Sequence, residues 1–497
     1  MKAIPLNSFK GIFFNILLCV LLDTIMIFRN KPYILFSLLT IFVRAIAAIP
    51  ITYFDDAFIT FRYARNLSEG FGFVYNHGEN VLGVTGPLWG LIISPLFLIT
   101  DNAQVLVLAF NILLEAAIVF VTTKYIFGKE NSIASYIFLL FYLISPITAR
   151  INIGGMEMNL FILLSLVTLI IYSKEYNKLS IALSAILIFI RPEGVVLLFV
   201  LFTDIMFRKK YSLLLKSLLI AILIIIVPLF IQYFYYGSLL PQSIIAKSGL
   251  APQPLIVVIN EFLFSDIICI ISIPFFVIGI VQKKTKFYKL ILIWVSLFFL
   301  TYMIRRPLIW TWYPALVHYA MFVFASLGIN SLIVRFDLNR FFESKLFRII
   351  VPSLIISIWI IISVKFGSSP VDKHIFKPMV EYGKLQQFKN KTIMASDIGI
   401  VGFAFSDSYI IDTEALVSPQ VSFSDSYEEK IMKFKPDYIS VIAIKENIEL
   451  FQNDTLLSTI YSPINRFSIT GQKELYPDTD NLPNGWVQDY IIFKKIQ

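Results

Sequence analysis

The chain has 497 residues, of which 57% are hydrophobic and only 15% are charged. A typical soluble protein carries roughly 25% charged residues, so this composition excludes an ordinary soluble domain and indicates a membrane protein. The formal net charge of +9 would favour a nucleic-acid partner for a soluble protein. In a membrane protein basic residues gather in the loops on one side, and we expect no nucleic-acid partner.

The cysteines and histidines predict no metal centre. The two cysteines, Cys19 and Cys269, both lie within apolar runs, and His77, His318 and His374 are far apart in the sequence. The sequence contains no CxxC pair, zinc-ligand spacing or HExxH motif. Metal binding through nitrogen or sulfur is therefore not expected, and no cofactor is predicted to be required.

Hydrophobic runs predict a polytopic α-helical membrane protein of about 11–12 spans, because a spanning helix needs about 20 mostly apolar residues. The predicted spans are 33–51, 103–123, 132–149, 157–172, 178–190, 194–207, 213–234, 256–281, 289–304, 314–334 and 348–366. The run 11–28 could be a further span, an interfacial helix or a signal-like segment. Residues 86–100 are short and interrupted by Pro87 and Pro95, which predicts a partial or interfacial helix.

Basic residues are divided unequally between the two sets of connecting loops. Eighteen Lys and Arg residues lie in 29–31, 124–129, 174–178, 208–216, 283–289 and 335–348. The opposite loops hold seven, namely Arg62, Arg65, Arg150, Arg191, Lys247, Arg305 and Arg306. Since positive loops stay in the cytoplasm, the first set is predicted to be cytoplasmic.

The composition changes after the last predicted span. Residues 367–497 carry polar residues throughout, with short apolar runs that alternate with helix-like stretches, as in a soluble α/β domain. We therefore predict two domains. Residues 1–366 form a membrane domain with a first outer loop at 52–102, and residues 367–497 form an extracytoplasmic α/β domain.

The first outer segment, 53–79, is predicted to form a helix along the membrane surface. Its phenylalanines recur at helical spacing, while Asp55, Arg62 and Asn66 form a second stripe. Asp55 and Asp56 lie at the start of this helix, where an aspartate can be an ordinary cap. Two adjacent carboxylates at a membrane surface are also suited to acid–base chemistry.

Three further outer segments carry charges that could bind a substrate. Glu157 follows two glycines at the start of a span, where a helix N-terminus also favours a carboxylate. Arg191 and Glu193 lie at a helix break near membrane depth, where ionisable residues are costly. A structural contact between the two would also explain them. Lys247 lies in a proline-broken loop, where a single lysine is usually a solvated charge.

The segment 305–318 combines two arginines with Trp310, Trp312 and Tyr313, although interfacial aromatic residues also form a belt in many membrane proteins. In the C-terminal part, Asp397 and residues 412–414 are most simply explained by turns. Together the outer segments supply cations for a phosphate, carboxylates for acid–base work and rings for a sugar. This set suits a lipid-linked, phosphorylated sugar.

The residues DDAFITFRYARNLSEGFGFVYNHGENVLGVTGPLW (55–89) resemble the first outer loop of type C glycosyltransferases. They are most similar to the branch that contains the mycobacterial terminal arabinofuranosyltransferases. GGMEMNLF (154–161), RPEG (191–194), YYGSLLPQSIIAK (235–247) and parts of 396–419 continue the resemblance in order. Met158 and Gln242 depart from it where Thr and Asn are usual, which bears on the identity of the donor sugar.

The resemblance implies a type C glycosyltransferase fold. It also implies that a polyprenyl-phosphate sugar donates its glycosyl group, outside the cytoplasm, to a glycan, glycolipid or protein acceptor. In this branch the sugar is often a pentofuranose.

We expect Asp55 or Asp56 to accept the proton of the acceptor hydroxyl, with inversion at the anomeric carbon. Arg191, with Lys247 as a second cation, is expected to stabilise the leaving phosphate. The expected donor-binding residues are Arg62, Arg65, Glu157, Arg191, Glu193, Lys247, Trp312, Tyr313 and His318. A divalent metal could bind the carboxylates, but the sequence does not require one.

Two other classes of function compete with this hypothesis. A lipid-linked sugar transporter or flippase would need polar residues through the bilayer, whereas Asp23, Glu115 and Asp204 are the few acidic residues within apolar runs. A non-catalytic glycan-binding protein would leave the adjacent Asp55 and Asp56 unexplained.

Overall fold

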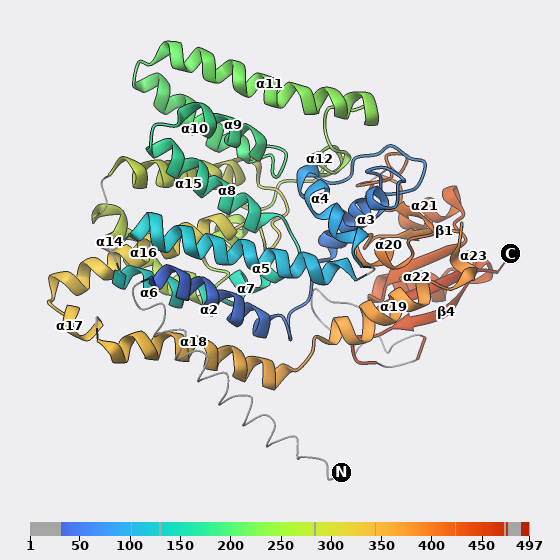
Figure 1. Cartoon of the computed structure of the whole chain (residues 1–497). Helices are drawn as coiled ribbons and strands as arrows, with labels where there is room; N and C mark the ends of the chain where they lie inside the picture. The colour runs from blue at the N-terminus through green and yellow to red at the C-terminus, as the bar shows by residue number, and fades with distance from the viewer. Residues whose placement is uncertain are drawn as a thin grey trace, which may run out of the picture.

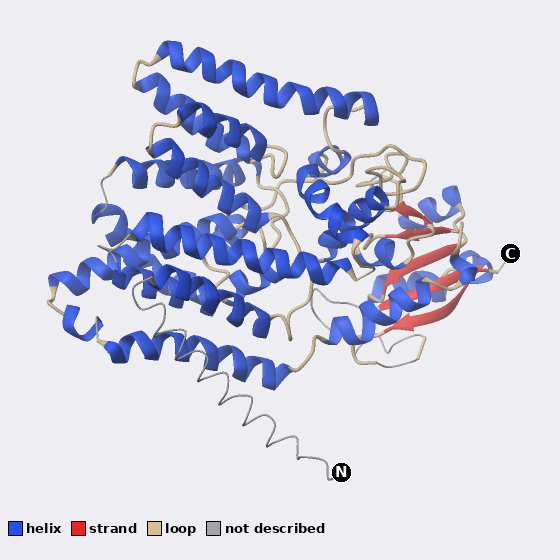
Figure 2. Cartoon of the chain, in the orientation of Figure 1, coloured by secondary structure: helices blue, strands red, loops and turns tan. Residues whose placement is uncertain are grey.

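The computed structural model describes residues 31–496, except 101, 129–131, 283–284, 343, 423, 472–473 and 476–488. A bundle of long helices makes up most of the molecule, and a small β-sheet lies at one end of the bundle (Figures 1 and 2). The ambiguous run 11–28, with Cys19 and Asp23, lies outside the described residues.

Each of the eleven hydrophobic runs predicted to span the membrane contains a helix. These helices are α2 (Pro32–Ala47), α5 (Ala103–Val121), α6 (Ser132–Ile144), α8 (Met158–Ser173), α9 (Asn177–Leu187), α10 (Gly194–Phe207), α11 (Tyr211–Tyr236), α14 (Ile267–Gln282), α15 (Lys286–Arg305), α16 (Ala315–Arg335) and α18 (Lys345–Phe366). Among the described residues, five helices are long and apolar enough to cross a membrane alone, and bent helix pairs raise this to seven. The prediction of a polytopic helical membrane protein is confirmed.

The two bent pairs place short helices beside long ones. In the first pair α6 meets α7 (Pro146–Ile153) at 71°, and in the second α13 (Leu255–Leu263) meets α14 at 86°. Proline at the start of α7 explains the first bend, because the residue before a proline is disfavoured in the helical conformation.

Short helices connect the bundle to the sheet. They are α3 (Asp55–Ser68), α4 (Pro87–Ile93), the 3-10 helix η1 (Ser94–Leu98), α12 (Gln242–Ser248) and α19 (Lys377–Gly383). The predicted partial helix over 86–100 corresponds to α4 and η1. The segment 53–79, predicted to form a helix along the membrane surface, is helical only over α3, whose first turn carries both aspartates. Phe58 and Phe61 of α3 are buried and contact Phe403, so the sheet domain covers the face that was predicted to lie on the membrane surface.

The C-terminal part contains a five-stranded mixed sheet in the order β2-β1-β3-β5-β4. Its strands are β1 (Thr392–Ala395), β2 (Tyr409–Asp412), β3 (Tyr438–Ile442), β4 (Tyr461–Phe467) and β5 (Tyr490–Lys495). The first three are parallel, since α20 (Ile400–Ala404) and α21 (Tyr427–Phe434) cross between them, whereas β5 and β4 pair antiparallel. Helices α22 (Lys445–Asn453) and α23 (Thr455–Ile460) complete this α/β unit.

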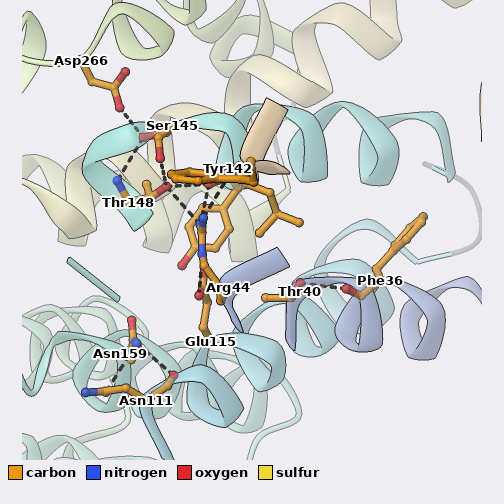
Figure 3. Close-up of polar contacts among 12 residues, drawn as sticks. Phe36, Thr40, Arg44, Asn111, Glu115, Tyr142, Ser145, Thr148, Asn159 and Asp266 are labelled. Carbon is orange, nitrogen blue, oxygen red and sulfur yellow. Dashed lines mark hydrogen bonds and ion pairs between the residues drawn. The ribbon is translucent and has the colours of Figure 1, made fainter. Parts of the chain in front are cut away.

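Two acidic residues within the bundle are neutralised by basic partners. The Arg44 Nε donates to both carboxylate oxygens of Glu115 at 2.9 Å, and its remaining nitrogens reach the carbonyls of Tyr142 and Leu143 (Figure 3). Asp204 pairs with Lys286 at 2.8 Å. Arg44 and Glu115 are fully buried, and a buried charge is tolerated only when it is paired and hydrogen-bonded, whereas Asp204 and Lys286 are partly exposed. These residues therefore hold helices together.

Candidate active site

A cavity of about 450 Å³ lies where the membrane helices meet the sheet domain. It is bounded by the start of α3, residues 83–86, the start of α8, the turn before α10, α12 and the segment that leads into α16. The sheet domain contributes Leu416 to its wall. The charged residues that line it are Asp56, Glu157, Arg191, Glu193, Lys247 and Arg305.

The two adjacent aspartates have different surroundings. Asp56 lines the cavity, whereas the Asp55 carboxylate accepts hydrogen bonds from the backbone N–H groups of Gly399 at 3.0 Å and Ile400 at 2.7 Å. Burial, together with the negative charge of Asp397, raises the pKa of Asp55 well above its usual range. Asp55 therefore joins α3 to the sheet domain, and Asp56 is the aspartate available to a substrate.

Arg191 organises the carboxylates on one wall of the cavity. Its guanidinium forms ion pairs with Glu157 and, at 3.0 Å, with Glu193, and it lies over the Tyr313 ring. The Tyr302 hydroxyl also donates to Glu193. The sequence allowed either a substrate-binding role or a structural contact for Arg191 and Glu193. The structure contains the direct contact between them. It includes Glu157, from a turn 34 residues earlier.

A glycine brings Glu157 into this position. Gly155 has a φ of +87°, a conformation that L side chains rarely adopt, and a Cβ there would press against Phe61 and Ala57 of α3. The Trp89 indole donates to the Gly155 carbonyl at 3.2 Å and holds the same turn from α4. The glycine pair before Glu157 thus lets the start of α8 pack directly against α3.

Lys247 lies on α12 and faces the same cavity. Among the residues that the structure describes, no carboxylate forms an ion pair with Lys247. Burial lowers its pKa, but the neighbouring Tyr313 hydroxyl and Asp56 outweigh this effect, so the pKa lies above the usual value. Lys247 is therefore a half-buried, protonated amine available to an anionic ligand.

Asp397 of the sheet domain, for which the sequence indicates a turn, does not line the cavity but lies close to Asp55 and Asp56. Asp397 follows β1, and its carboxylate accepts a hydrogen bond from the Tyr490 hydroxyl of β5 at 2.7 Å. Burial raises the pKa of Asp397, and the charge of Asp56 raises it further. Tyr302 lines the cavity from inside a predicted span. The sequence does not predict this position, because no spacing links the Tyr302 hydroxyl to Glu193.

The turn at Asp412 agrees with its sequence-based interpretation. The carboxylate accepts hydrogen bonds from the backbone N–H groups of Glu414 at 2.8 Å, Val417 at 3.0 Å and Leu416. Burial raises the pKa of Asp412 to about 7. This turn holds Leu416 against the cavity.

The structure places seven of the eleven predicted site residues around the cavity. They are Asp56, Glu157, Arg191, Glu193, Lys247, Trp312 and Tyr313. Trp312 stacks on Trp310 and contacts Phe54, so the predicted aromatic platform forms a wall of the cavity. A divalent metal at the cavity carboxylates would compete with Arg191, which already binds Glu157 and Glu193.

Arg62 does not line the cavity. Its guanidinium is 1% exposed and donates to the backbone carbonyls of Tyr75 at 2.7 Å, Ser408 at 2.8 Å and Gly402. Because these carbonyls belong to the first outer loop and the sheet domain, Arg62 fastens the two together and is not placed to bind a donor.

Arg65 and His318 also lie away from the cavity. Arg65 stacks on the Phe403 ring at 3.7 Å and donates to the Phe403 carbonyl at 3.1 Å. His318 is fully buried in the first turn of α16, where its Nε2 lies 3.1 Å from the Phe262 carbonyl. Neither residue is part of the lining of the cavity, so these positions do not support their predicted donor-binding roles.

Fold and cavity together define a multi-pass helical membrane protein with a mixed-sheet domain over one end of the bundle. Comparison with protein-family models and with the sequences of curated proteins gives no match.

Two solved structures show a similar fold. The first is that of ArnT from Cupriavidus metallidurans in the apo state, with 10% sequence identity, a TM-score of 0.62 and coverage of 93% of this chain and 98% of that chain. The second is the same protein bound to undecaprenyl phosphate, with 11% identity, a TM-score of 0.59 and coverage of 92% and 97%. The ArnT-like fold thus extends over both the helical bundle and the sheet domain.

Proposed function

We propose that this chain is a glycosyltransferase that moves a sugar from a polyprenyl-phosphate donor to a glycan, glycolipid or protein acceptor. The observation that carries the proposal is the cavity at the junction of the two domains, which is lined by both the carboxylate of Asp56 and the amine of Lys247. The fold supports it, because a protein of similar fold has been solved with undecaprenyl phosphate bound.

In this proposal Asp56 is the general base. It accepts the proton of the acceptor hydroxyl while that oxygen forms a bond to the anomeric carbon of the donor. The bond between the anomeric carbon and the phosphate oxygen breaks, and its electron pair leaves with the polyprenyl phosphate. One displacement of this kind inverts the anomeric centre. A positioned base contributes typically about 10²–10⁴-fold to the rate.

Lys247 is the cation for the leaving phosphate, whose negative charge grows as the bond breaks. Arg191 is already shared by Glu157 and Glu193. We infer that this triad fixes the wall of the cavity and orients the sugar, whose apolar face would rest on Trp312 and Tyr313. The chemistry uses no metal in this scheme, and the donor sugar is left to experiment, with pentofuranoses among those to test.

We place the cavity on the non-cytoplasmic face. The loops rich in Lys and Arg lie at the end of the bundle away from the sheet (Figure 1), where Arg208 pairs with Glu175 and Lys286 with Asp204. The sheet domain covers the opposite, basic-poor end. Because basic loops stay in the cytoplasm, the cavity and the sheet domain face outward.

The test uses full-length protein purified into lipid, with a panel of radiolabelled polyprenyl-phosphate sugars and a membrane glycan extract as acceptor. Wild type is compared with Asp56→Asn and with Asp407→Asn, a control at an exposed aspartate of the sheet domain. We expect transfer by wild type and the control, and loss of transfer by a folded Asp56→Asn. Equal transfer by all three would overturn the proposed chemistry. Lipid flipping without transfer would favour a transporter.

A further inference from the structure

A second group of chemically capable side chains lies inside the helical bundle, separate from the cavity. Asp266 precedes α14, Cys269 lies in the first turn of α14, and His318 lies in the first turn of α16. One potential ligand atom from each residue lies within 4.8 Å of the others, and all three residues are at most 2% exposed. The 86° bend between α13 and α14 brings Asp266 and Cys269 to His318.

The hydrogen bond of His318 fixes which of its ring nitrogens is free. Nε2 lies 3.1 Å from the carbonyl oxygen of Phe262, and a carbonyl can only accept, so Nε2 carries the proton. Nδ1 of the neutral ring then holds a lone pair. Within the described part of the chain, Nδ1 is buried with no hydrogen-bond partner. Metal-binding histidines are commonly oriented in this way, by a carbonyl on the nitrogen that does not bind the metal.

Asp266 is held in place by two donors. Its Oδ1 accepts from the backbone N–H of Ile268 at 2.8 Å, and the Ser145 hydroxyl donates to Oδ2 (Figure 3). Each carboxylate oxygen keeps a lone pair. In the described residues no basic side chain forms an ion pair with Asp266, which contrasts with Glu115 and its partner Arg44 in the same bundle. A buried carboxylate without a counter-ion is costly.

We propose that Asp266, Cys269 and His318 bind one divalent cation of the zinc class. Oxygen, sulfur and nitrogen are all ligands of Zn²⁺, and three protein ligands leave a fourth position for water. Tetrahedral Zn²⁺ holds its ligand atoms roughly 3.5 Å apart, so the widest pair would close by roughly 1 Å. Binding releases the proton of the Cys269 thiol. The thiolate, the carboxylate and the cation then sum to zero charge inside the bundle.

The ion would position the wall of the cavity and take no part in the reaction. It would join the bend before α14 to the first turn of α16, and α16 follows directly on Trp312 and Tyr313. Phe262, whose carbonyl holds His318, also contacts the Tyr302 ring at 5.1 Å. The metal site does not depend on the proposed function, since its ligands lie outside the cavity.

The first experiment measures the metal content of the full-length protein. It is purified on a tag that uses no metal from cells grown with and without added Zn²⁺, and is analysed by elemental mass spectrometry. We expect about one zinc per chain from zinc-replete cells and a higher melting temperature than for protein from depleted cells. Less than about one-tenth of an equivalent from both cultures, in folded protein, would overturn the proposal.

The second experiment identifies the ligands. Protein from zinc-depleted cells is titrated with Co²⁺, whose charge-transfer absorption reports a bound thiolate. We expect the charge-transfer absorption of wild type to saturate at one equivalent of Co²⁺ per chain. The same is expected of the control variant His374→Ala, which changes a histidine outside the cluster. Cys269→Ser is expected to lose the band, and Ser145→Ala to bind about tenfold more weakly, as for other residues that orient a ligand. A Co²⁺ signal that persists in both Cys269→Ser and His318→Ala would show adventitious binding and would overturn the assignment. If neither variant folds, the zinc content and melting temperature of wild type decide the question.

Discussion

The carboxylate of Asp55 receives the backbone N–H groups of Gly399 and Ile400, while that of Asp56, the next residue, lines the cavity. Successive residues of an α-helix point about 100° apart, since one turn takes 3.6 residues. The two adjacent aspartates at the start of α3 can therefore point in different directions, Asp55 toward the sheet domain and Asp56 into the cavity. One connects the sheet domain to the bundle, and the other is open to a substrate.

This division predicts different consequences for the two neutral variants. Asp55→Asn replaces one acceptor oxygen by an amide that faces an N–H donor, so we expect it to destabilise the contact by about 1–3 kcal/mol. Asp56→Asn should leave the melting temperature unchanged and remove transfer. Thermal melting and limited proteolysis near α20 measure the difference. Equal melting temperatures for both variants would contradict the assignment of Asp55.

Lys247→Met is expected to weaken donor binding. A hydrogen bond to a charged group contributes about 1.5–3 kcal/mol, or roughly 10–100-fold in affinity. The Kd for polyprenyl phosphate should rise by that factor, and Lys247→Arg should recover part of the loss because the positive charge is retained. Binding is measured by fluorescence or by competition with labelled donor. An unchanged Kd in Lys247→Met would remove Lys247 from the phosphate site.

Gly399→Ala tests the close approach between the sheet domain and α3. A Cβ at Gly399 would overlap the backbone carbonyl and the carboxylate of Asp55, and neither can move without shifting α3. Overpacking of this kind costs about 1–3 kcal/mol. Gly249→Ala is the matched control, because the nearest atom to its Cβ, the Ala246 carbonyl oxygen, is 3.8 Å away. Equal stability of the two variants would show that the contact is loose.

Asp412 predicts a dependence of stability on pH. Its pKa in the folded protein is about 7, above the usual 3.8, so the folded state binds the proton more tightly than the unfolded state does. Its stabilising effect is complete below about pH 4 and is lost as the pH rises through about 7. The shift corresponds to an upper bound of roughly 4 kcal/mol. Thermal melting between pH 4 and 8 should show this decline in wild type and a flatter profile in Asp412→Asn. Identical pH profiles of the melting temperature for wild type and Asp412→Asn would contradict this role of Asp412.

Much of the bundle could be predicted from the sequence because hydropathy is a local property. Each predicted span contains a helix, and the short run with Pro87 and Pro95 ends as α4 and η1. The gathering of Glu157, Arg191, Lys247 and Tyr313 at one cavity was also predictable in outline. Once the alternation of spans places their loops on one side, the ends of neighbouring helices bring them close together.

The remainder depends on contacts between distant segments. Arg62 shares a helical stripe with Asp55, which suggests a ligand site, but its partners Gly402 and Ser408 lie more than 300 residues away. His318 and Cys269 are 49 positions apart and match no metal motif, yet the bend before α14 brings them together. No local sequence pattern indicates that Cys269 and His318 are close in space. The absence of metal motifs from the sequence therefore does not exclude a metal site whose ligands come from distant segments.

The sheet order has a consequence for the biosynthesis of the protein. Of the five strands β5 comes last in the sequence, yet it lies between β3 and β4, and its first residue, Tyr490, binds Asp397 near Asp55 and Asp56. The nascent chain can insert its helices while the junction is still unfinished. Only when β5 pairs does the Tyr490 hydroxyl reach Asp397. The helices are thus synthesised long before the sheet is complete, and termination before β5 would yield an inserted protein that lacks the strand between β3 and β4 and the contact of Tyr490 with Asp397.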